Sequence, residues 1–255
     1  MMFSMKKLFP STLAALAVIF GLSTATTQAI IIDGIDWTSV WEGNVVPNSA
    51  PGTTAEPSFS TFGGTFTVNS GTTTTAGTNA GASGPSPTSA WAGGTSGNGT
   101  DSILEFRVKV LTQGSEVDQP VGTSLFVGWN GQRFQLGLNM VGTNYAEFAG
   151  GSFLGTNTVT LDTTAWHTYR IVFFDSTNSA SLYIDGINTG LTQAGSGGLA
   201  DVVQFHRYTG AVSATGTSEW DYIRWTNAIP EPSALALLGL AAFTMGSAGL
   251  RRRRN

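Results

Sequence analysis

The amino-acid sequence predicts an all-β fold, an antiparallel β-sandwich, and three observations support this prediction. Apolar and polar side chains alternate with a period of two over much of residues 30–228, turn signals recur between the alternating runs, and no stretch there has the periodicity of an amphipathic helix. With 15 phenylalanines and 7 tryptophans, the chain holds enough apolar surface to build a core. A length of 255 residues allows one large β domain or two small ones.

The clearest strand lies at residues 104–110, where apolar residues occupy every second position and charged residues the positions between. This alternation predicts a half-buried strand with Phe106 in the core. Residues 169–173 alternate in the same way, and we expect Ile171 to face the core as well.

Turn signals separate the strands that follow. Asn130-Gly131 stands between apolar runs at residues 125–129 and 132–138, which predicts a hairpin. A turn over residues 175–179 leads into a strand that closes on Asp185-Gly186.

The last predicted strand covers residues 219–226 and contains Trp220 and Trp225. Their odd spacing places them on opposite faces of one strand, so we expect only one of them in the core unless a loop covers the other.

Residues 69–100 are dominated by Gly, Ser, Thr, Ala and Asn. Such a segment is either a linker between two domains or a long loop within one. We expect a loop, because residues 36–68 are too few for an independent sandwich.

The N-terminus has the organisation of a secretory signal peptide, residues 1–29. Lys6 and Lys7 precede an uncharged apolar run over residues 8–22, and small polar residues lead to a predicted cleavage site after Ala29. The alternative is a retained membrane anchor. Fifteen helical residues, at about 1.5 Å each, fall short of the roughly 30 Å hydrocarbon core, which favours cleavage.

The C-terminus carries a second uncharged apolar run, residues 233–250, which predicts a transmembrane helix. The basic residues that follow it stay cytoplasmic under the positive-inside rule and form a retention cluster: Arg251, Arg252, Arg253 and Arg254. Both ends of the chain therefore place residues 30–228 outside the inner membrane.

Immediately before this apolar run stand Ile229, Pro230, Glu231 and Pro232. The order Pro-Glu-Pro, apolar helix and arginine cluster resembles the PEP-CTERM sorting signal of bacterial exported proteins, over residues 229–255. The resemblance implies handling by an exosortase-type membrane protease, transient anchoring in the inner membrane, a final place at the cell surface or outside the cell, and association with extracellular polysaccharide. Ile229 departs conservatively from the valine that is commonest in this signal.

Three strand motifs in residues 30–228 resemble the concanavalin A-like, laminin-G-like jelly roll. They are Trp-His-Thr-Tyr-Arg-Ile at 166–171, Leu-Tyr-Ile-Asp-Gly at 182–186 and Trp-Asp-Tyr-Ile-Arg-Trp at 220–225. Residues 41–68, beginning Trp-Glu-Gly-Asn, resemble the opening strands of bacterial members with sorting tails. This fold hosts lectins, adhesion modules, lyases and hydrolases, so it does not assign a function.

Catalysis on this scaffold needs two neighbouring carboxylates, and the sequence offers two candidate pairs. Glu116 and Asp118 stand in a predicted loop, and Glu219 and Asp221 on the last strand. We expect solvated or structural roles for both pairs, and therefore no catalytic residues. The alternative is a polysaccharide-active hydrolase or lyase.

No cofactor or resident metal is expected. A chain without cysteine excludes disulfides, iron–sulfur clusters and thiol catalysis. His167 is expected to make a structural hydrogen bond, and His206 lacks a second ligand at zinc spacing. One oxygen-ligated structural calcium is compatible with the acidic composition, but no loop motif assigns its place.

The function predicted from these observations is that of an exported surface or matrix protein, non-enzymatic and able to bind glycan. Trp91, within the Gly/Ser-rich segment, is the candidate exposed aromatic residue for sugar stacking. Nucleic acid is excluded as a partner, because residues 30–228 hold six basic residues against fifteen acidic ones, a net charge of −9.

Overall fold

The computed structural model describes residues 35, 37–53, 55–78, 81–86, 101–113, 122–140, 142–150, 153, 155–197, 202–205 and 215–226. All of them belong to one compact unit, Gly34–Asn255. The predicted signal peptide and transmembrane helix lie outside these residues. Within the described part of the chain, no helix is long and apolar enough to cross a membrane.

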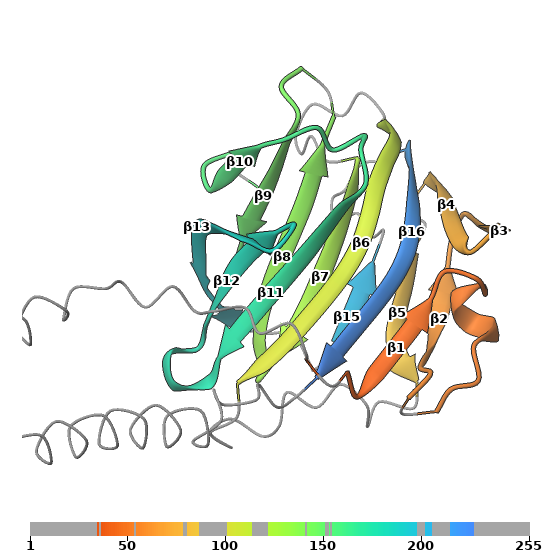
Figure 1. Cartoon of the computed structure of the whole chain (residues 1–255), viewed down its shortest axis with the longest axis horizontal. Coiled ribbons are helices and arrows are strands. Elements are labelled where there is room, and N and C mark those ends of the chain that lie inside the picture. The colour runs from red at the N-terminus through yellow and green to blue at the C-terminus, as the bar shows by residue number, and fades with distance from the viewer. Residues whose placement is uncertain are drawn as a thin grey trace, which may run out of the picture. The chain divides into compact units, whose positions relative to one another are not determined.

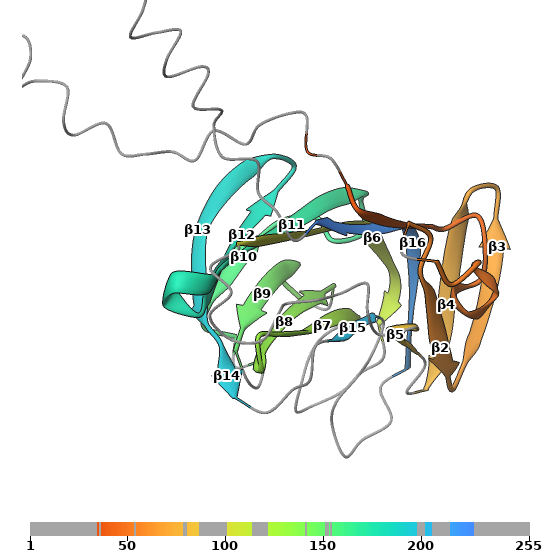
Figure 2. The same ribbon diagram turned by 90° about the horizontal axis from the view of Figure 1, so that it is seen from below.

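The described strands form two sheets, and the pairs within each sheet are antiparallel. Figure 1 shows the labelled strands of the sandwich, and Figure 2, turned by 90°, shows the two layers one above the other. The first sheet has the order β13 (Ile187–Ala194), β12 (Ser179–Ile184), β11 (His167–Phe174), β6 (Ser102–Gln113), β16 (Thr215–Thr226), β4 (Thr72–Thr78) and β3 (Thr65–Asn69), with β1 (Ser39–Glu42) also on β16. The second has the order β10 (Thr158–Thr160), β9 (Tyr145–Ala149), β8 (Gln132–Asn139), β7 (Thr123–Trp129), β15 (Val202–Phe205), β5 (Gly81–Ser86) and β2 (Ser58–Phe62), with β14 (Ser196–Gly197) on β8. Two short 3₁₀ turns, η1 (Pro47–Ser49) and η2 (Asp175–Thr177), are the helical elements of the described residues. The predicted two-sheet antiparallel sandwich is confirmed.

The core lies between the two sheets and follows the predicted alternation. Phe106 on β6 and Ile171 on β11 are both buried in it. Phe106 stacks on Tyr169 of β11, with 5.4 Å between ring centroids, so aromatic contacts connect neighbouring strands.

Both predicted hairpin turns are present. Asn130 and Gly131, between β7 and β8, have φ angles of 55° and 68°. Asp185 and Gly186, between β12 and β13, have φ angles of 51° and 79°. Positive φ at both central residues is the turn conformation that Asn-Gly and Asp-Gly favour.

The prediction that Trp220 and Trp225 point to opposite faces is wrong, because both are buried in the core between the sheets. A β-bulge accounts for the difference. Trp220 pairs with Val108 and Tyr222 with Arg107, so Asp221 is an extra residue on β16. An extra residue shifts the alternation by one position and returns both indoles to the same face.

The segment 69–100 differs from the predicted loop in the part that the structure describes. It contributes β4 to the first sheet and β5 to the second. Thr73 and Thr75 on β4 are fully buried, and the Thr75 hydroxyl lies 2.8 Å from the hydroxyl of Ser218. Buried hydroxyls that bond to one another let a polar sequence form strands, which the apolar pattern alone does not reveal.

Candidate functional site

A pocket lies at the edge of β1 that faces away from β16, between this strand and the segment that leads to β2. One edge of β1 pairs with β16, from Ser39 opposite Trp225 to Glu42 opposite Tyr222. On the other edge, the Val40 amide donates to the Ala55 carbonyl over 2.8 Å. The loop 43–57 therefore folds back along β1 and borders an open pocket with a volume of about 510 Å³.

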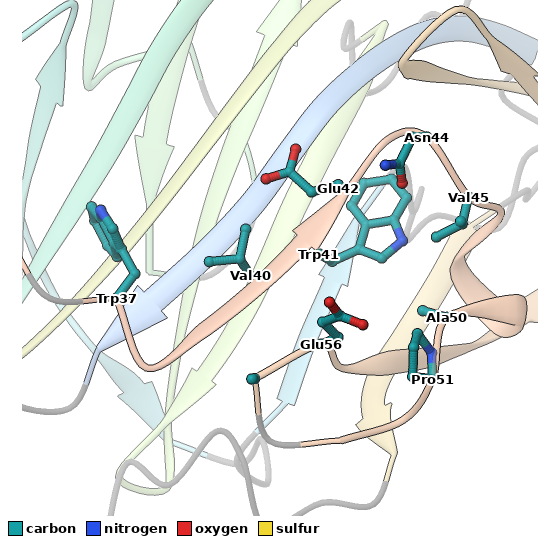
Figure 3. A pocket seen from close by; sticks show the side chains of 10 residues that line it. Trp37, Val40, Trp41, Glu42, Asn44, Val45, Ala50, Pro51 and Glu56 are labelled. Atoms are coloured by element: carbon teal, nitrogen blue, oxygen red, sulfur yellow. The ribbon is translucent and has the colours of Figure 1, made fainter.

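The lining of the pocket combines aromatic, carboxylate and apolar groups (Figure 3). The aromatic residues are Trp37 and Trp41, and the polar ones are Glu42, Asn44 and Glu56. Five small apolar residues complete it: Val40, Val45, Ala50, Pro51 and Ala55. A mostly apolar lining with a few polar groups is typical of small-ligand sites.

The loop that forms the pocket is fixed by contacts to the sandwich. The Thr73 hydroxyl donates to the carbonyl of Gly43 over 2.8 Å and lies 3.2 Å from that of Val45. Gly43 itself packs so closely on β16 that an added Cβ would lie 2.3 Å from the Trp220 carbonyl oxygen. Only glycine fits at this junction, so a larger residue at position 43 would push the start of the loop away from β16.

Trp37 is held by cations on the outer face of the first sheet. Its ring lies 4.4 Å from the Arg224 guanidinium carbon and 6.0 Å from that of Arg170. These distances are in the range of cation–π contacts. The ring is half-buried and forms one end of the pocket (Figure 3).

Trp41 points the other way, into the core. It is 1% exposed, and its ring centroid lies 5.2 Å from that of Phe205. Its Nε1 atom is buried and has no hydrogen-bond partner among the described residues. An indole N–H is a donor only, so one of the residues that line the pocket carries a buried donor without an acceptor.

Glu42 lies on the outer face and is exposed, and its pKa is raised above the ordinary value of 4.5. Partial desolvation of the carboxylate is the largest cause, and the negative charge of Asp221 adds to it, while Arg224 acts in the opposite direction. Glu56, on the other side of the pocket, is exposed.

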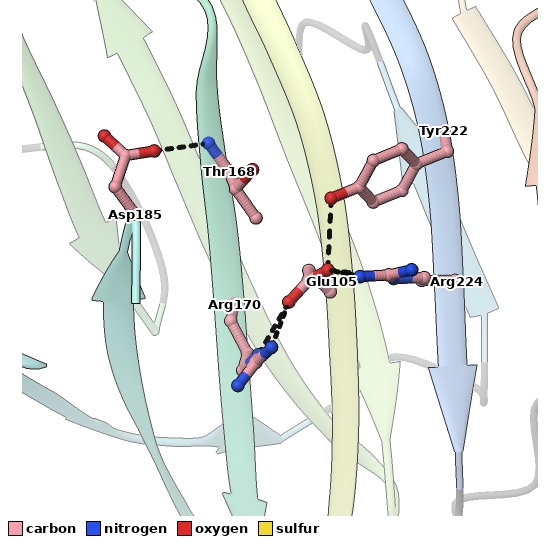
Figure 4. A network of polar contacts seen from close by, with 6 residues as sticks. All are labelled: Glu105, Thr168, Arg170, Asp185, Tyr222 and Arg224. Atoms are coloured by element: carbon pink, nitrogen blue, oxygen red, sulfur yellow. Dashed lines mark hydrogen bonds and ion pairs between the residues drawn. The ribbon is translucent and has the colours of Figure 1, made fainter. Parts of the chain in front are cut away.

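Next to Trp37, the outer face carries a buried ionic cluster of Glu105, Arg170, Tyr222 and Arg224 (Figure 4). The Glu105 side chain is 1% exposed, although the alternation of β6 turns it away from the core. Arg170 Nε donates to its carboxylate over 2.7 Å and Arg224 Nε over 2.8 Å, and the Tyr222 hydroxyl donates over 3.1 Å. The cluster joins β11, β6 and β16 and holds the arginines on which Trp37 rests.

Each member of the candidate carboxylate pair on the last strand binds a cation of β6. Glu219 lies 2.8 Å from Lys109 Nζ and also accepts a hydrogen bond from Thr72. Burial raises the pKa of Glu219, but the hydrogen bonds from Lys109 and Thr72 outweigh it, and the net shift is downward. Asp221 lies 2.7 Å from Arg107 Nη1. Both acids are therefore ion-paired to cations of the same strand.

His167 has the structural role that the sequence predicts. Its Nδ1 lies 2.6 Å from an Asp185 carboxylate oxygen, and its Nε2 lies 3.0 Å from the Asp162 carbonyl. Asp185 also accepts a hydrogen bond from the Thr168 amide over 2.9 Å (Figure 4). His167 therefore connects the hairpin turn after β12 to the start of β11.

The other predicted site residues lie outside the described part of the chain. They are Ala29, Trp91, Glu116, Asp118, His206, Pro230, Glu231, Pro232 and Arg251 to Arg254. Among the residues that are described, no three acidic or histidine side chains gather as a metal site. The structural calcium stays a prediction without a place.

The pocket residues Trp37, Glu42, Asn44 and Glu56 were not identified as site residues from the sequence. The sequence feature nearest to these residues is a segment with prolines at 47, 51 and 57, which follows Trp-Glu-Gly-Asn at 41–44. Prolines restrict such a loop, but the pattern does not say which side of β1 it covers.

Solved structures similar to this chain share low sequence identity with it. A carbohydrate esterase of the Shiga toxin-encoding bacteriophage phi24B is 14% identical, with 77% of this chain and 100% of that chain covered and a TM-score of 0.47. A Trypanosoma rangeli sialidase is 15% identical, over 76% of this chain and 31% of that chain, with a TM-score of 0.49. A Bacillus licheniformis β-glucanase is 13% identical, over 76% of this chain and 94% of that chain, with a TM-score of 0.38.

A comparison with curated proteins found no match. The C-terminal residues do match a known sorting signal, over residues 228–254. This range includes the Pro-Glu-Pro sequence, the apolar run and the four arginines from which the signal was predicted. C-terminal to its two-sheet antiparallel sandwich, the chain thus carries a PEP-CTERM protein-sorting motif, which implies processing by exosortase.

Proposed function

We propose that this protein is a non-enzymatic, glycan-binding module of the cell surface or the extracellular matrix, delivered there by exosortase-type sorting. The sorting motif supports the export and the processing. The glycan and the place in the matrix are proposals that rest on the chemistry of the pocket at β1.

The observation that carries the proposal is the pairing of a tryptophan ring with hydrogen-bonding groups in that pocket. Trp37 offers an aromatic surface, and Glu42, Asn44 and Glu56 offer oxygen and amide groups. A sugar presents C–H groups on its faces and hydroxyls at its rim. Apolar contact with a ring and hydrogen bonds to carboxylates and amides suit these two kinds of group.

Binding without turnover is supported by how the acids of the last strand are used. Glu219 and Asp221 are ion-paired to Lys109 and Arg107, and Glu105 to two arginines. A retaining glycosidase needs one carboxylate free to attack and a second free to donate a proton. These three acids are held in structural contacts instead.

A second candidate function, polysaccharide hydrolysis, is favoured by Glu42. Its raised pKa is a property of catalytic acids, and the pocket holds a second carboxylate, Glu56. In this alternative Glu42 protonates the leaving oxygen.

The two functions are separated by incubating the full-length protein, in detergent micelles without sugar headgroups, with a panel of polysaccharides. Co-sedimentation measures binding, and new reducing ends or unsaturated ends measure cleavage. We expect binding to at least one polysaccharide without new ends. Cleavage that is lost in Glu42→Gln would replace the binding proposal by hydrolysis, and neither binding nor cleavage would refute both.

A further inference from the structure

The indole N–H of Trp41 is the least explained polar group of the pocket. The side chain is 1% exposed, and Nε1 has no hydrogen-bond partner among the described residues. By contrast, Trp129 and Trp220, equally buried, donate to the hydroxyls of Ser102 and Ser218 over 3.1 and 2.8 Å. A buried donor without a partner lacks the hydrogen bond that water gives it in the unfolded chain, so an acceptor supplied by a ligand removes this cost.

We infer that the pocket binds a neutral, hydroxyl-rich sugar unit, with one sugar oxygen accepting from Trp41 Nε1 and sugar hydroxyls donating to Glu42 and Glu56. This inference rests on the proposed glycan-binding function and gives it a site and a ligand class.

Trp41 excludes a ligand that offers only donors at this position. An ammonium group has no acceptor and would leave the indole N–H unsatisfied. A hydroxyl or ring oxygen can accept the hydrogen bond, and an acetamido carbonyl can do so as well. Figure 3 shows the indole nitrogen on the side of the ring nearest Val45, at the loop wall of the pocket.

The charge of the pocket disfavours an anionic sugar. Glu42 and Glu56 both line it, and Asp221 is near enough to raise the pKa of Glu42. The neighbouring guanidinium of Arg224 shares the one carboxylate of Glu105 with Arg170, so these three side chains keep one positive charge. Two carboxylates of the lining outweigh it, and a uronate or sulfate would meet more negative than positive charge.

The apolar lining suits the faces of a sugar ring. Trp37 and Val40 lie at one end of the pocket, and Ala50 and Pro51 lie across from β1 (Figure 3). The side chains of Val40, Ala50 and Pro51 have no hydrogen-bonding groups, and the face of the Trp37 ring is apolar, so all of them can contact C–H groups. The volume of about 510 Å³ is within the range of small-ligand pockets.

The test is calorimetric titration of the full-length protein, in a detergent without sugar headgroups, with methyl glycosides. Methyl glucoside, methyl galactoside and methyl N-acetylglucosaminide are the neutral probes, and glucosamine and glucuronate are the charged ones. We expect saturable binding of at least one neutral probe and binding at least tenfold weaker for both charged probes.

Three variants locate the site. Trp41→Phe removes the donor and keeps an aromatic ring, and Glu56→Gln removes the charge of an exposed carboxylate of the pocket. Each is expected to weaken binding of the neutral probe at least fivefold. The matched control Trp129→Phe removes the N–H of an equally buried tryptophan outside the pocket, and it is expected to bind like the wild type. Circular dichroism of each variant checks that it is folded.

The outcomes separate the site from the function. If Trp41→Phe and Glu56→Gln both bind as the wild type does, the inferred site is wrong, although glycan binding itself stands. Stronger binding of glucosamine or glucuronate than of every neutral probe overturns the ligand class. If no sugar binds to the wild type, the inference and the proposed function both fail.

Discussion

Trp41 and Glu42 are neighbours on β1 and point to opposite faces of the sheet, yet both line the same pocket. Successive residues of a strand alternate between its faces, so a site on one face contains only one of them. Both line it here because β1 pairs with β16 through one edge, while the pocket lies along the other. The site therefore wraps around a strand edge, and its two sides have different chemistry.

The first prediction concerns Glu42 and pH. Burial and Asp221 raise its pKa in the folded state above 4.5, so the folded protein binds more protons than the unfolded chain in the window above that value. The charged form of Glu42 thus opposes folding at neutral pH. Glu42→Gln is expected to raise the free energy of unfolding at pH 7 and to leave it unchanged well below pH 4.5. Urea unfolding at both pH values measures this, and equal stability at pH 7 would contradict it.

The pKa of Glu219 is shifted in the opposite direction from that of Glu42, so Glu219→Gln is the matched control for Glu42→Gln. Its pKa is lowered in the folded state, since hydrogen bonds from Lys109 and Thr72 outweigh the effect of burial. The stabilisation is present above the unfolded value near 4.5 and is lost as the pH falls through the folded pKa. Glu219→Gln is expected to lower the free energy of unfolding at pH 7, by an amount that shrinks on acidification. A difference that grows on acidification would show that the pair does not stabilise the fold.

The buried cluster around Glu105 predicts that the near-isosteric substitution Glu105→Gln lowers the free energy of unfolding strongly. Glu105→Gln keeps the shape of the side chain but leaves Arg170 and Arg224 without a counter-charge. Loss of one partner of a buried ion pair costs about 3–5 kcal/mol. Asp221→Ala breaks the more exposed pair with Arg107 and is expected to cost about 0–1 kcal/mol. Denaturant unfolding compares the two variants, and similar small losses for both would mean that the Glu105 cluster contributes little.

The bulge at Asp221 predicts that deletion of this residue and truncation of its side chain have different effects on stability. Deleting Asp221 removes the extra residue and places Trp220 and Trp225 on opposite faces, so one indole leaves the core. The deletion variant is therefore expected to lose cooperative unfolding, in contrast to Asp221→Ala. Heat unfolding monitored by tryptophan fluorescence tests this. A deletion variant as stable as Asp221→Ala would show that the bulge does not set the register.

Phe106→Ala tests the centre of the core. Phe106 is 1% exposed, stacks on Tyr169 and lies 5.8 Å from Trp220 between ring centroids. Its truncation is expected to cost about 3–5 kcal/mol. Phe66→Ala, in the partly buried edge strand β3, is the control with a smaller expected loss. A loss below about 1 kcal/mol for Phe106→Ala would contradict its place in the core.

Much of the fold was predictable because it rests on local patterns. Alternation placed Phe106 and Ile171 in the core, and Asn130-Gly131 and Asp185-Gly186 marked their turns, since each depends on a few adjacent residues. The bulge at Asp221 was not predictable, because it is defined by the register against β6 rather than by the residue itself.

The site was less accessible from the sequence than the fold. Its residues come from β1 and from the loop 43–57, and only the folded loop brings Glu56 to the same pocket as Trp37. Glu105 shows the same limit: its place in the alternation predicts an exposed charge, but two arginines from separate strands bury it. Long-range contacts of this kind leave no periodic signal.

The measurement that tests the account most directly is a glycan array probed with the full-length protein and its Trp41→Phe variant, with and without a calcium chelator. The account predicts that the wild type retains neutral glycans, that the chelator does not change this because the pocket contacts sugar directly, and that Trp41→Phe loses the signal. A wild type that retains no glycan, or a Trp41→Phe variant with an unchanged signal, would contradict it.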